Sequence, residues 1–112
     1  MEILTKKTEN CTIVEIKGRL DTTNYNALES EFNKIIDKEN HSILVDCSNL
    51  VYVSSSGLRV FLVALKTLNK LNGKFLMSNL QDNIQEIFEI SGFISIFKVY
   101  ASNEEALAQC ES

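Results

Sequence analysis

The chain has 112 residues, of which 45% are hydrophobic and 23% are charged, and its formal net charge is −4. This length fits one domain over residues 1–112, and the apolar share is too high for a disordered protein. The acidic balance argues against a nucleic-acid partner, which requires a basic face. No apolar run is long enough to cross a bilayer, and the N-terminus lacks the apolar core of a signal peptide, so we expect a cytoplasmic protein with no membrane partner.

The first half of the chain predicts a hairpin followed by an amphipathic helix. Residues 2–7 and 12–17 favour two antiparallel strands, and Gly18 is expected to permit a turn. Helix N-cap candidates follow at residues 21–24. A helix of about four turns is then predicted by apolar residues at helical spacing. These residues are Tyr25, Leu28, Phe32, Ile35 and Ile36.

The second half alternates between strand and helix patterns. The predicted strands cover residues 42–46, 74–78 and 96–100, and the predicted helices cover 58–71, 82–91 and 103–110. Gly73 is expected to end the first of these helices in the left-handed conformation, and Gly92 is expected to close the second. This alternation predicts an α/β layered fold with a mixed, mostly parallel sheet and about four helices.

Cysteine and histidine usage shows no metal site and no catalytic centre. The three cysteines are widely spaced and form no CxxC pair. We expect Cys11 and Cys47 to act as small hydrophobes at strand edges and Cys110 to lie near a frayed chain end. The single histidine, His41, stands in a polar stretch and is expected to be solvated. We therefore predict no metal, no cofactor and no catalytic residue, and hence no enzyme.

Three consecutive serines and a glycine stand between a strand end and the start of the long helix. Residues 53–58 read VSSSGL. Ligands of α/β folds gather at the carboxyl ends of strands, and a helix N-terminus there tolerates a phosphate group. Helix capping explains one serine. Gly57 costs about 1 kcal/mol against Ala inside a helix, which favours a close backbone approach or a special turn. The residues alone leave capping and a functional role open.

Other phosphate-binding and hydrolytic motifs are absent. The chain contains neither GxxxxGK[ST] nor GxGxxG. A nucleophile elbow requires GxSxG, and Ser55-Ser56-Gly57 lacks the first glycine. These absences disfavour a small enzyme or a nucleotide-binding domain.

Residues 46–60, DCSNLVYVSSSGLRV, resemble the signature of STAS domains, specifically those of bacterial anti-sigma factor antagonists. Shorter matches follow the family order at GRLD (18–21), NGK (72–74) and EISGF (89–93), so the resemblance covers essentially the whole chain. It implies a single STAS domain. It also implies a family aspartate near the serine loop at Asp21, and another at the end of the central strand at Asp46. Many members carry Asp where Ser54 stands, and others carry serine there.

The resemblance further implies a phosphorylation switch. An unphosphorylated antagonist of this family binds an anti-sigma factor that is also a serine kinase, which releases the sigma factor. Phosphorylation of the antagonist causes the complex to dissociate. A serine phosphatase then removes the phosphate and resets the cycle. Aligned on Gly57, the modified residue corresponds to Ser55, with Ser56 as the alternative acceptor. The implied partner-binding residues are Asp21, Ser54, Ser55, Ser56, Gly57, Leu58 and Arg59.

A second interpretation keeps the STAS fold without the switch. The chain would then be a scaffold or a transport-complex module in which Ser55 only caps a helix. The basic stripe Arg59, Lys66 and Lys70 is most simply a solvated helix face. Exposure of Val63 on that face would favour a docking surface.

Overall fold

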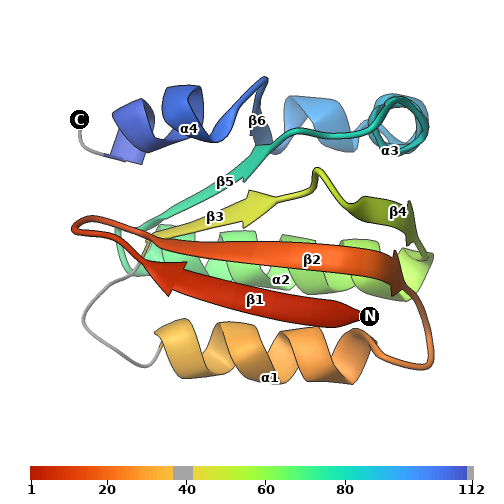
Figure 1. Cartoon of the computed structure of the whole chain (residues 1–112), viewed down its shortest axis with the longest axis horizontal. Coiled ribbons are helices and arrows are strands. Elements are labelled where there is room, and N and C mark those ends of the chain that lie inside the picture. Colours follow the sequence, from red (N-terminus) through yellow and green to blue (C-terminus); the bar gives the residue numbers. More distant parts are fainter. Residues whose placement is uncertain (37–41, 111–112) are drawn as a thin grey trace.

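The computed structural model describes residues 1–36 and 42–110, which form six strands, four α-helices and one 3-10 helix (Figure 1). His41 lies outside these residues. The strands are β1 (Glu2–Lys7), β2 (Thr12–Leu20), β3 (Ser42–Asp46), β4 (Leu50–Val53), β5 (Lys74–Ser78) and β6 (Lys98–Tyr100). The helices are α1 (Tyr25–Ile36), α2 (Ser55–Lys70), α3 (Asp82–Ser91), η1 (Phe93–Ser95) and α4 (Asn103–Cys110).

The strands form one sheet in the order β1-β2-β3-β5-β6, and β4 pairs with β2 outside this path. Strands β1 and β2 are antiparallel, whereas every other pair is parallel. Among the described residues, four α-helices accompany this sheet. The predicted fold class, α/β with a mixed and mostly parallel sheet, is therefore confirmed.

Strand β2 changes its neighbour halfway along its length. Residues 12–15 pair with β3, whereas residues 18–20 pair with β4. Gly18 has φ +96°, and the register shifts between Gly18 and Arg19. The predicted turn at Gly18 is therefore wrong, because the strand continues through an irregularity that a left-handed glycine permits. This second pairing brings β4, which the sequence did not predict as a separate strand, beside the end of β2.

The sheet separates two apolar cores. In β3, Ile43 and Val45 belong to the main core, which receives buried residues from α1, α2 and α3, whereas Leu44 faces the opposite side. There Cys11, Leu44, Leu76 and Ala106 form a satellite core beneath α4. Strand β3 is thus buried on both faces, as its continuous apolar sequence predicted.

Helix ends follow the predicted positions with one exception. Asn72, with φ +60°, takes the left-handed position after α2, so the assignment of that position to Gly73 is wrong. The Gly73 N–H donates to the Leu68 carbonyl at 2.7 Å, and the Asn72 N–H donates to the Asn69 carbonyl at 3.2 Å, which is the Schellman pattern. Gly92, with φ +81°, ends α3 as predicted.

Candidate functional site: the start of helix α2

The serine segment joins β4 to α2, and Ser54 is the N-cap of the helix. Its backbone is extended, and its Oγ accepts a hydrogen bond from the Gly57 N–H at 3.2 Å. Its own N–H donates to the Leu20 carbonyl at 2.9 Å, which ties the helix start to the end of β2. The cap is therefore Ser54, and the alternative that gives this role to Ser55 is wrong.

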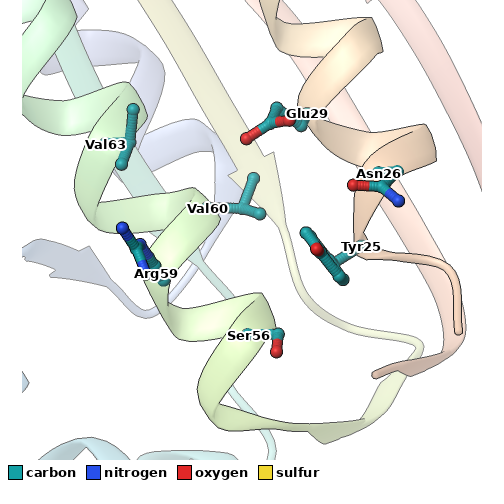
Figure 2. A pocket seen from close by; sticks show the side chains of 7 residues that line it. All are labelled: Tyr25, Asn26, Glu29, Ser56, Arg59, Val60 and Val63. Atoms are coloured by element: carbon teal, nitrogen blue, oxygen red, sulfur yellow. The ribbon is translucent and has the colours of Figure 1, made fainter. Parts of the chain in front are cut away.

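The next two serines lie in the first turn of α2 and differ in their surroundings. Ser55 is exposed, and its hydroxyl makes no hydrogen bond to any described residue. Ser56 is half-buried and lines a groove between α1 and α2 (Figure 2). Ser54 is engaged in capping and Ser56 is half-buried. Of the three serines, Ser55 is therefore the one whose hydroxyl is both exposed and free of a hydrogen bond to the described residues.

Gly57 lets the helix start press against two strand ends. A Cβ at this position would lie 2.7 Å from Cγ of Leu20 and 2.8 Å from Cγ2 of Val53. Both neighbours are buried in the main core and have little room to move. Of the two reasons expected for this glycine, the close approach is thus the one that the structure shows. It fixes the position of the serines relative to β2 and β4.

The groove beside Ser56 has a volume of about 320 Å³. It is lined by Tyr25, Asn26 and Glu29 from α1 and by Ser56, Arg59, Val60 and Val63 from α2 (Figure 2). Val63 is 47% exposed, which is the condition under which we expected a docking surface. Arg59 is also exposed, so the groove offers both an apolar wall and a cation next to the serines.

A polar cluster lies at the adjoining end of β2. The Asp21 carboxylate accepts hydrogen bonds from the Thr23 hydroxyl at 2.6 Å and from the Thr23 N–H at 3.0 Å. These bonds, aided by Arg19 at 3.9 Å, lower the pKa of Asp21. The Arg19 guanidinium also lies 4.1 Å from the centroid of the Tyr52 ring, in a cation–π contact. Sequence reasoning missed Arg19 and Tyr52, although their pairing across β2 and β4 places them beside the serine segment.

The structure brings most of the predicted partner-binding residues to this one end of the molecule. Asp21 follows Leu20, which is bonded to Ser54, and Arg59 lines the groove next to Ser56. Gly57 is buried, and Leu58 is half-buried against the main core, so these two residues shape the surface from beneath.

Asp46 belongs to a different network. Its carboxylate accepts hydrogen bonds from the Asn103 side chain at 3.0 Å, the Ser48 N–H at 3.0 Å and the Asn79 side chain at 3.2 Å. Burial raises the pKa of Asp46, but these hydrogen bonds outweigh burial and lower it. The residue thus joins the ends of β3 and β5 to the start of α4.

The chain thus has a mixed sheet in which the short parallel strand β4 leads through the N-cap Ser54 into the long helix α2. The STAS domain family model matches residues 2–106. The chain therefore belongs to the STAS domain family.

Known relatives extend this result. BtrV of Bordetella bronchiseptica, which carries the name anti-sigma factor antagonist, is 36% identical over 108 residues, covering 96% of this chain and 93% of its own. A Thermotoga maritima structure described as an anti-sigma factor antagonist superimposes with a TM-score of 0.93 at 18% identity, covering 98% and 95% of the two chains. The anti-sigma factor antagonist SpoIIAA, in its unphosphorylated form, gives a TM-score of 0.84 at 19% identity with coverage of 98% and 96%.

Helices of the described residues are too short or too polar to cross a membrane. The cellular compartment stays a prediction.

Proposed function

We propose that this chain acts as one domain, over residues 1–112, in the role of an anti-sigma factor antagonist. Its unphosphorylated form binds an anti-sigma factor with serine kinase activity and thereby releases a sigma factor. Phosphorylation of Ser55 ends this binding, and a serine phosphatase restores it. Support for the general role comes from the name of the 36% identical relative. The observation that carries the switch is the exposed, uncommitted Ser55 hydroxyl at the first residue of α2.

Ser55 is a better acceptor than its neighbours. The Ser54 hydroxyl is engaged in capping, and Ser56 lies half-buried in the groove. A phosphate on Ser55 would stand at the positive end of the α2 dipole, one turn before Arg59, and no acidic residue occupies the first turn. The fold therefore tolerates the modified residue, so the switch needs no unfolding.

Binding and release follow from charge at this surface. The partner covers the helix start, Asp21 and the groove with its exposed Val63. A phosphoryl group adds about −1.5 to −2 charges, which would face the nucleotide phosphates of the kinase across a poorly hydrated contact. A loss of about 3 kcal/mol in binding free energy weakens affinity more than a hundredfold. SpoIIAA, which shares the fold, has also been solved in a phosphorylated form.

Phosphorylation is tested directly by mass. The chain is incubated with a purified anti-sigma serine kinase and ATP, alongside Ser55→Ala, Ser56→Ala and the double variant. We expect the wild type and Ser56→Ala to gain one phosphoryl group and Ser55→Ala to gain none. Absence of any gain, or a gain that persists in the double variant, contradicts the assignment.

Release is tested by binding to the same kinase. Wild type and Ser55→Ala should bind, whereas Ser55→Asp should bind much more weakly. The matched control is Ser95→Asp, which adds the same charge at an exposed serine in η1 and should bind like the wild type. Equal affinity for wild type and Ser55→Asp, together with equal affinity for the phosphorylated chain, would show a scaffold rather than a switch.

A further inference from the structure

Cys11 and Cys110 meet beneath the last helix although they stand at opposite ends of the chain. Cys11 is fully buried immediately before β2, and Cys110 is half-buried at the end of α4. The side chain of Cys110 packs against the satellite core that contains Cys11. Besides burial, the proximity of the Cys110 thiol raises the pKa of Cys11. The two side chains therefore lie close to each other in the same apolar cluster.

The fold holds this contact from both sides. The Thr8 side chain and N–H both donate to the Cys11 carbonyl, at 2.8 and 2.7 Å, which fixes the backbone before β2. On the other side, Ala106 anchors α4 in the satellite core, and Lys74 donates to the Gln109 carbonyl next to Cys110. Contacts of the fold thus hold the backbone on both sides of the pair.

We propose that Cys11 and Cys110 are a redox-sensitive pair that forms a reversible disulfide and fastens α4 to the sheet. The oxidant is a low-molecular-weight disulfide, RSSR. The half-exposed Cys110 thiolate attacks one sulfur, the S–S bond breaks, and one RS⁻ leaves and takes up a proton. The Cys11 thiolate then attacks the Cys110 sulfur and expels the second RS⁻. Two protein thiols are oxidised to one disulfide, and RSSR is reduced to two RSH.

The two cysteines differ in reactivity, and the difference agrees with Cys110 reacting first and Cys11 second. Burial, together with the neighbouring Cys110, raises the pKa of Cys11 to about 12, so Cys11 is a poor first nucleophile in the free protein. Cys110 is the thiol of the pair that solvent can reach. The second step limits the rate and becomes faster as pH rises, because the thiolate fraction of Cys11 grows.

Cys47 provides an internal control. It is fully buried, burial raises its pKa, and its sulfur contacts the Val45 carbonyl. It belongs to the main core, on the other side of the sheet from Cys11. It should therefore stay a free thiol under oxidation.

The test uses the full chain and oxidised glutathione, followed by labelling of free thiols under denaturing conditions. We expect a product lighter by two hydrogen atoms, with one labelled cysteine, Cys47, and a melting temperature about 10 °C above that of the reduced chain. Dithiothreitol should reverse both changes. Cys47→Ser should still form the disulfide and retain no labelled thiol.

The variant Cys110→Ser tests whether Cys110 is part of the disulfide. It should fold even if Cys11→Ser does not, because Cys110 is half-exposed and Cys11 is buried. It should keep two labelled cysteines and show no rise in melting temperature. Three labelled thiols in the oxidised wild type, a lasting glutathione adduct on Cys110, or a disulfide that includes Cys47 would each overturn the proposal.

Discussion

Gly57 lies so close to Leu20 that a single added carbon would stand 2.7 Å from Cγ of that leucine. The contact joins the first turn of α2 to the last residue of β2, and Ser54 adds a hydrogen bond to the same leucine at 2.9 Å. The serines are therefore presented on a rigid junction of helix and strand.

Replacing Gly57 with Ala should destabilise the protein by about 1–3 kcal/mol, because overpacking against Leu20 and Val53 outweighs the gain in helix propensity. Urea denaturation measures this change. Ser55→Ala serves as the control, since it alters an exposed position in the same turn. A Gly57→Ala protein as stable as the wild type would show that the helix can shift without cost.

The adjacent residues Ser54 and Ser55 should contribute differently to stability, because Ser54 caps α2 and Ser55 does not. Ser54→Ala removes the acceptor for the Gly57 N–H and should cost about 1 kcal/mol in the free energy of unfolding. Ser55→Ala should change stability by less than about 0.5 kcal/mol, because that hydroxyl is exposed. Chemical denaturation of both variants checks the difference. A larger loss in Ser55→Ala than in Ser54→Ala would contradict the cap assignment.

Acid should weaken the fold partly through Asp46. Its pKa is lowered in the folded state from an ordinary value of 3.8, so its contribution is complete above that value and is lost as pH falls through the folded pKa. Unfolding free energies measured from about pH 6 down to about pH 2 should fall less steeply in Asp46→Asn than in the wild type. Glu86→Gln, at an exposed position of α3, is the control. Equal slopes in Asp46→Asn and wild type would argue against this role.

The left-handed residue after α2 offers a stabilising change. Asn72→Gly should raise stability by a few tenths to about 1 kcal/mol, because glycine adopts φ +60° without steric cost. Asn72→Ala should instead lower it. Thermal unfolding of the two variants reports the opposite signs, and a shift in the same direction for both would exclude backbone strain as the cause.

The spacing of apolar residues predicted much of this structure, because it shows which side of a single helix or strand is buried. The continuous apolar run of β3 reflects burial on both faces, and the spacing of Leu28, Phe32 and Ile35 reflects one buried side of α1. Patterns also placed the serine segment at a helix start. They failed where the outcome depends on a distant partner: β4 is a strand because it pairs with β2 beyond Gly18.

The candidate site shows the same division. The serine motif and its family resemblance were visible in the chain itself, since they rest on neighbouring residues. The structure was needed to show that Ser54 caps α2 and that Ser55 is exposed. It was also needed to show that Leu20 and Val53 leave no room for a side chain at Gly57.

By itself, then, the sequence determined the order and type of most elements and placed the serine segment at the start of a helix, because residue spacing and N-cap preferences are properties of neighbouring residues. Only the tertiary structure decided that Arg19 stacks on Tyr52 and that Cys110 packs against the apolar cluster that contains Cys11. The first contact depends on the pairing of β2 with β4, and the second depends on the packing of α4 against the sheet, and neither is recorded in the spacing of neighbouring residues.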